Sequence, residues 1–114
     1  MIKPILENRL AEVENLLSNV DEVCLAIAYV RSSGVRMLRP TYLQTKASFK
    51  ILVDTKQRFT EKKALQQLLS DNFSMKRFAG NKIYHPKVWL FRRGMEWRVI
   101  VGSMNLSSVA LNSN

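Results

Sequence analysis

Hydrophobic positions along the chain follow two patterns, a helical spacing and short continuous runs. Near the start, apolar side chains recur every three or four residues, at Leu6, Leu10, Val13, Leu17 and Val20. This spacing predicts an amphipathic helix over residues 4–19, with Pro4 in its first turn. Residues 23–30 then form an apolar run rich in β-branched side chains, which is typical of a strand buried on both faces.

The same two patterns recur through the middle of the chain. A short helix follows the first run, capped by Ser32 or Ser33 and ended or kinked at Pro40. A second apolar run, over residues 49–53, predicts another central strand. Thr60 is the predicted cap of the next helix, which has apolar residues on one side and lysines and glutamines on the other.

The last third predicts a short strand over residues 75–78 and then a hairpin. The first strand of the hairpin ends at Phe91, the turn is Arg93–Met95, and the return strand covers residues 97–101. A further helix is expected over residues 106–111. Strands that alternate with helices predict a layered α/β fold, and the hairpin makes the central sheet mixed.

Side chains able to do chemistry gather at the open end of this hairpin. His85, the only histidine, is two residues from Lys87, so a strand turns both side chains to the same face. The return strand leads into Gly102, Ser103 and Asn105, which the hairpin carries back toward that end. An imidazole, an ammonium group, a hydroxyl and an amide around one centre can hold and attack a phosphate.

This arrangement resembles the motif of the phospholipase D superfamily, in which His-x-Lys, a hairpin and Gly-Ser-x-Asn follow one another. The positions that match are His85, Lys87, Gly102, Ser103 and Asn105. The resemblance implies a layered α/β/α sandwich with a mixed central sheet, as one phospholipase D-like domain over residues 1–114. Many members carry an Asp five residues after the Lys, where this chain has Arg92. Because some nuclease branches also lack that Asp, the departure weakens a lipase reading more than a nuclease reading.

The resemblance also implies roles for the motif residues. His85 would attack phosphorus and form a phospho-histidine, with Lys87 and Asn105 as the other catalytic residues. Lys87, Gly102, Ser103 and Asn105 would bind the substrate phosphate. Neither a metal ion nor another cofactor is expected. Since each chain has one histidine and the family's route uses two, a homodimer that shares the site between its chains is expected.

Charge points to the partner. Eighteen lysines and arginines against nine aspartates and glutamates give a net charge of +9 and a pI near 10.1. Such an excess favours a polyanionic partner, nucleic acid first and an anionic membrane surface second. The alternative is that these side chains are simply solvated. The candidates for phosphate contacts are Lys62, Lys63, Lys76, Arg77, Arg92 and Arg93.

The remaining composition sets limits on chemistry and location. Cys24 is the only cysteine and lies in the first apolar run, so we expect a buried thiol in a reducing compartment. One histidine and one cysteine cannot build a zinc site within one chain. The eight-residue run over 23–30 is too short to span a bilayer, and no secretion signal opens the sequence. A cytoplasmic protein without a transmembrane segment is expected.

Functions of different classes stay open. The first is a metal-independent phosphodiesterase, a DNA endonuclease that acts through phospho-histidine with its site shared across a homodimer. The alternative is a catalytically incomplete phospholipase D-like module that binds nucleic acid or dimerises. A lipid phosphodiesterase ranks third, since no apolar surface helix is evident. The end at Asn114, inside an expected helix and before the family's acidic residue, favours the N-terminal part of a longer protein.

Overall fold

The computed structural model describes residues 9–54, 60–78, 87–101, 106–107 and 111. These residues form three helices and a five-stranded mixed sheet, so the predicted α/β fold with a mixed central sheet is confirmed. The elements, in chain order, are α1 (Arg9–Leu17), β1 (Glu22–Ile27), α2 (Ser32–Tyr42), β2 (Ser48–Val53), α3 (Lys62–Ser70), β3 (Ser74–Arg77), β4 (Lys87–Arg93) and β5 (Glu96–Val101).

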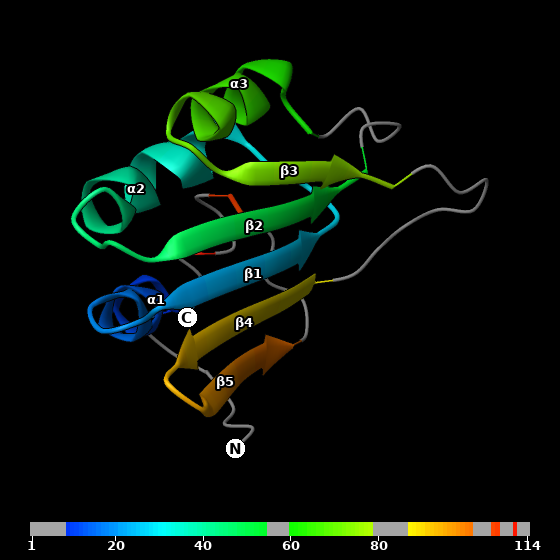
Figure 1. Cartoon of the computed structure of the whole chain (residues 1–114). Coiled ribbons are helices and arrows are strands. Elements are labelled where there is room, and N and C mark those ends of the chain that lie inside the picture. The colour runs from blue at the N-terminus through cyan, green and yellow to red at the C-terminus, as the bar shows by residue number, and fades with distance from the viewer. Residues whose placement is uncertain (1–8, 55–59, 79–86, 102–105, 108–110, 112–114) are drawn as a thin grey trace.

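The strand order across the sheet is β3-β2-β1-β4-β5 (Figure 1). β1, β2 and β3 run parallel to one another, and β4 runs antiparallel to both of its neighbours. One end of the sheet therefore holds the carboxyl ends of β1, β2, β3 and β5 together with the start of β4. We call this end the carboxyl edge; its end residues are Ile27, Val53, Arg77, Lys87 and Val101.

The three described helices cover one face of the sheet, and the core lies between them and that face (Figure 1). Val23, Leu25 and Ile27 of β1 are buried there, whereas the residues between them are only half-buried. The expectation of a strand buried on both faces is therefore wrong for the described part of the protein. Small side chains occupy the other face of β1, and no described helix packs on it.

Neither α2 nor α3 is capped as the sequence predicted. The N-cap of α2 is Arg31, and the N–H of Ser32 donates to Oε1 of Glu61 at 2.7 Å. Glu61 is in turn the N-cap of α3. Thr60 instead uses its hydroxyl to accept a 3.3 Å hydrogen bond from the N–H of Val30. Both helix starts are thus fixed by contacts across the carboxyl edge, which local sequence does not encode.

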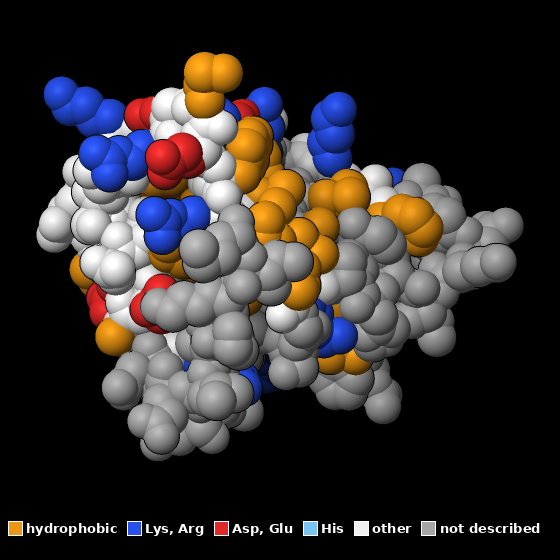
Figure 2. All heavy atoms as spheres, turned by 90° about the horizontal axis from the view of Figure 1, so that it is seen from below, with side chains coloured by type: hydrophobic (Ala, Val, Ile, Leu, Met, Phe, Trp, Pro, Cys, Tyr) orange, Lys and Arg blue, Asp and Glu red, His pale blue; other side chains and the backbone are white. Residues whose placement is uncertain are grey.

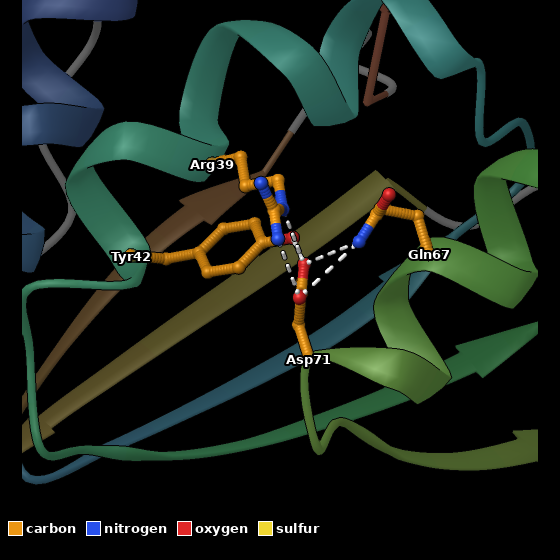
Figure 3. A network of polar contacts seen from close by, with 4 residues as sticks. All are labelled: Arg39, Tyr42, Gln67 and Asp71. Carbon is orange, nitrogen blue, oxygen red and sulfur yellow. Dashed lines mark hydrogen bonds and ion pairs between the residues drawn. The ribbon is translucent and has the colours of Figure 1, made fainter.

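A polar cluster joins the far ends of α2 and α3 (Figure 3). Pro40 lies inside α2, which continues to Tyr42, so the helix does not end at the proline. The Asp71 carboxylate, at the C-cap of α3, accepts from the Arg39 guanidinium at 2.9 and 3.1 Å. The Tyr42 hydroxyl and the Gln67 amide also donate to it. This cluster fixes the two helices to each other at the end away from the carboxyl edge.

The hairpin has the predicted form. β4 and β5 are joined through Gly94 and Met95, and Gly94 has φ of +61°, the backbone conformation that glycine favours in a two-residue turn. Beyond β5, the N–H of Leu111 donates to the Ser107 carbonyl at 3.0 Å, the spacing of the predicted last helix. Leu106, expected to open that helix, instead forms a parallel bridge with Val30.

Candidate functional site at the carboxyl edge

Lys87 is the predicted site residue that the structure describes. It is the first residue of β4, pairs with Ile27 of β1, and is half-buried. It shares the helix-covered face of the sheet with the buried Trp89, since strand residues two apart face the same way. The other predicted site residues lie outside the described residues: His85, Gly102, Ser103 and Asn105.

The described chain on either side of the Gly-Ser-x-Asn motif is held at the same edge. Val101, at the end of β5, pairs with Val88 of β4. Leu106, after the motif, bridges Val30, and backbone hydrogen bonds of 2.9 and 3.2 Å fix it beside the continuation of β1. Because β4 lies between β1 and β5, the start of β4 at Lys87 lies between these two points.

Helix α2 packs tightly against the residues that follow the motif. A Cβ atom at Gly34 would lie 2.4 Å from the carbonyl carbon of Leu106 and 2.5 Å from the backbone nitrogen of Ser107. Only glycine allows this approach without a shift of backbone. No local sequence pattern predicts this contact, because it joins a helix to a segment that lies far away along the chain.

Cations outnumber carboxylates at the carboxyl edge. The described basic side chains there are Arg31, Lys62, Lys63, Arg77 and Lys87. The Glu61 carboxylate accepts a hydrogen bond from the start of α2. Its pKa is lowered, first by this bond from the Ser32 N–H and also by the Arg31 charge. The Glu61 carboxylate lies 3.6 Å from Nε of Arg31. The remaining cations favour a polyanion at this edge.

Asp54 is a buried carboxylate at the carboxyl edge that no motif in the sequence marks as a site residue. It follows Val53 directly and is 1% exposed, the one fully buried charged side chain among the described residues. Moving a carboxylate from water into the protein interior costs on the order of several kcal/mol of free energy unless polar groups surround it. The fold therefore has to supply polar groups around Asp54 at this edge of the sheet.

The six predicted phosphate contacts do not lie on one surface. Lys62, Lys63 and Arg77 are exposed near the carboxyl edge, and Lys76 is exposed on the sheet face away from the helices. Arg93 and Arg92 lie at the opposite end of the sheet.

Arg92, which stands where many family members have Asp, has local partners at that far end. Its guanidinium lies 3.3 Å from Glu22 and 3.8 Å from Asp21. It also donates to the Gly94 carbonyl at 3.0 Å. Arg92 therefore fixes the closed end of the hairpin, about five strand residues or roughly 16 Å from Lys87.

Metal ligands and membrane spans are two further features to consider in residues 9–54, 60–78, 87–101, 106–107 and 111. Within these residues, no three histidine, cysteine, aspartate or glutamate side chains are grouped so that they could hold a metal ion. Likewise, none of their helices has the length and apolarity needed to cross a membrane.

Comparison with known proteins shows which fold this chain shares with solved structures. No protein-family model matches the sequence, and no curated protein matches it. Among solved structures, NucT from Helicobacter pylori superposes with a TM-score of 0.66 at 19% identity, over 93% of this chain and 72% of that one. A polyphosphate kinase from Porphyromonas gingivalis superposes with a TM-score of 0.59 at 16% identity, over 87% of this chain and 19% of that one. The chain therefore has the phospholipase D-like fold that the motif in its sequence predicted.

Proposed function

We propose that this protein is a metal-independent phosphodiesterase, and specifically a DNA endonuclease, acting as one domain in the cytoplasm. The observation that carries the proposal is the carboxyl edge, where the start of β4 at Lys87 and the end of β5 at Val101 belong to adjacent strands. The phospholipase D-like fold, the likeness to NucT and the net charge of +9 support the same reading.

In this proposal the site consists of His85, Lys87, Gly102, Ser103 and Asn105. One residue separates His85 from Lys87 in the sequence, so the proposal has the imidazole act together with the Lys87 ammonium group. The flanks of the Gly-Ser-x-Asn motif are held on either side of β4. Lys87 would offset negative charge on the phosphoryl oxygens, while Ser103 and Asn105 would donate hydrogen bonds.

The proposed reaction has two steps. A nitrogen of His85 bonds to phosphorus as the bond to the leaving oxygen breaks, and a second histidine gives that oxygen its proton. Water then attacks the phospho-histidine and gives a proton to the second histidine as the phosphorus–nitrogen bond breaks. An imidazole suits both roles, because its unperturbed pKa is about 6.5.

The second histidine would come from a second copy of the chain, since His85 is the only histidine in the sequence. A twofold axis near the carboxyl edge would bring two His85 side chains to one phosphate. Dimers made by mixing wild-type and His85→Ala chains would then be inactive, so excess mutant should suppress wild-type activity. Activity of a monomeric protein, or activity unaffected by the mutant chain, would contradict the shared site.

A catalytically incomplete nucleic-acid-binding or dimerisation module is the second candidate. The single histidine per chain favours it, because a chain that does not pair lacks the second imidazole. Incubation of the purified protein with supercoiled plasmid in excess EDTA separates the two functions. Nicking that Lys87→Ala abolishes supports the nuclease, whereas retarded but intact plasmid at every protein concentration supports the module.

A further inference from the structure

The sheet face opposite the helices, which we call the open face, carries a continuous apolar strip. Two rows of side chains cross the strands on this face, as the strand register shows. The row nearer the carboxyl edge consists of Lys76, Leu52, Ala26, Val88 and Val101. The next row consists of Ser74, Lys50, Cys24, Leu90 and Val99.

The apolar side chains in the middle of this strip are half-buried, and its β5 end is exposed. Val101 is 52% exposed, and Trp97, which lies on the same face of β5 beside the two rows, is 44% exposed. Figure 2, which views the molecule from the β5 side, shows a run of hydrophobic side chains on this side of the molecule, with basic and acidic side chains beside it. Sheet faces of this kind are normally covered by another element, and continuous exposed apolar patches mark interaction surfaces.

The shape of the strip fits an elongated apolar ligand. The small side chains of Cys24 and Ala26 form its floor, and Leu52, Val88 and Leu90 stand beside them around a groove of about 320 Å³. Across four strands the strip is about 14 Å long, since neighbouring strands lie about 4.8 Å apart. That length matches two to three turns of an α-helix, at about 5.4 Å per turn.

Charge identifies the kind of helix. On the β2–β3 side, the first row ends in the exposed Lys76. In the second row Lys50 lies next to the terminal Ser74, and its side chain is 60% exposed with its Nζ 3.0 Å from the Glu22 carboxylate. Among the described residues of the open face and its border, these two lysines and Arg92 stand against the carboxylates of Glu22 and Asp21, so positive charge is in excess.

We propose that the open face is the docking site for an amphipathic α-helix of a partner protein, whose apolar stripe fills the groove and ends in acidic residues. Such a helix would cover Cys24 and Leu90 and place its carboxylates near Lys50 and Lys76. Binding of a helix in a groove with complementary charge at one end fixes both the register and the direction of the helix.

The probe for this proposal is a pair of fluorescent 18-residue helical peptides with the same leucine stripe. One carries glutamates after the stripe and its twin carries lysines at those positions. We expect the acidic peptide to bind at least about tenfold more tightly than its lysine twin, since a favourable charge pair across an interface changes the affinity by roughly that factor. Equal binding of the twins, or no binding of the acidic peptide, overturns the proposal.

Variants locate the binding. Val99→Thr with Val101→Thr keeps β-branched side chains but adds hydroxyls to the strip, and should weaken binding. Lys76→Glu should weaken it too, whereas the matched Lys63→Glu on exposed α3 should not. Equal loss for both lysine variants would mean non-specific charge attraction and would overturn the site. A wild-type dimer that the valine variant converts to monomer would assign the face to a second copy instead.

Protection of Cys24 from alkylation tests whether the peptide covers the same groove. Cys24 is the only thiol in the chain, so its alkylation by iodoacetamide reports on one position. The pKa of this thiol is raised, chiefly by burial, so the reaction is best followed at mildly alkaline pH. The bound acidic peptide should slow alkylation several-fold; an unchanged rate at saturating peptide would place the peptide elsewhere.

Discussion

The Asp71 carboxylate holds together the ends of two helices through donors from Arg39, Tyr42 and Gln67 (Figure 3). Its side chain is only 6% exposed, so the negative charge depends on those donors. The Arg39 hydrogen bonds lower the pKa of Asp71 most, and the Tyr42 hydroxyl adds to the effect. The pKa of Tyr42 is raised, mainly by burial and then by its bond to Asp71, so the phenol stays protonated.

Asp71→Asn should therefore lower the free energy of unfolding by about 2 kcal/mol at neutral pH, because a buried charged acceptor is lost. A carboxylate whose pKa is lowered in the folded state stabilises the fold above its unfolded pKa, near 3.8. That contribution disappears as pH falls through the lowered folded pKa. Urea unfolding from pH 7 to pH 3 should show the gap between wild type and variant closing at the acidic end.

Glu96→Gln is the matched control, since it removes one carboxylate from an exposed position in β5. Its effect on the free energy of unfolding should stay within about 0.5 kcal/mol across the same range. An Asp71→Asn deficit that is constant with pH would show that the lost packing, and not the lost charge, is responsible.

At the scale of elements, α2 connects the site region to the rest of the fold. Its first turn meets Glu61 at the carboxyl edge, and Gly34 contacts the backbone of Leu106 and Ser107. Its last turn is anchored through Arg39 and Asp71 at the other end. A change in the first turn of α2 is thus transmitted directly to the residues that follow the Gly-Ser-x-Asn motif.

Gly34→Ala tests this contact. In a solvent-exposed helix the change would stabilise the fold by up to about 1 kcal/mol through helix propensity. Here the added methyl meets backbone at 2.4 Å, so we expect a net loss of about 1–3 kcal/mol, the usual effect of overpacking. Thermal unfolding measures it, with exposed Arg36→Ala in the same helix as the control. Gly34→Ala at or above wild-type stability would disprove the tight approach.

Helices and strands with a regular spacing of apolar residues could be predicted from the sequence. The contacts between these elements could not. The two apolar runs and the predicted hairpin correspond to β1, β2 and the β4–β5 pair. The predicted caps Ser32 and Thr60 were wrong, because Glu61 reaches α2 from a distant part of the chain. Gly34 and Asp54 carried no local signal for the same reason. Of the predicted site, Lys87 lies at the carboxyl edge, and the roles of His85 and Asn105 stay predictions.

At the scale of the whole molecule, the basic surface is divided between the two ends of the sheet. Arg77 lies at the carboxyl edge and Arg93 lies at the turn end. If DNA binds at the carboxyl edge, only the first of these should contact a phosphate. Both side chains are exposed, so their removal should have little effect on folding.

DNA affinity should fall steeply with salt, because each neutralised phosphate releases counterions. Arg77→Ala should reduce the slope of log affinity against log salt by about one, the amount expected for one lost phosphate contact. Arg93→Ala should leave the slope unchanged. Titration of a short labelled duplex at several salt concentrations measures both. Equal effects of the two variants would mean that charge, and not position, determines binding.

We propose that the carboxyl edge of this phospholipase D-like fold hydrolyses phosphodiesters without metal through His85. The most direct test is the rate of plasmid cleavage in excess EDTA by His85→Ala, measured beside wild type after circular dichroism has shown both to be folded. We expect a loss of about 10³-fold or more in the cleavage rate, the scale seen when a nucleophile is removed. Cleavage by folded His85→Ala at the wild-type rate would contradict this proposal.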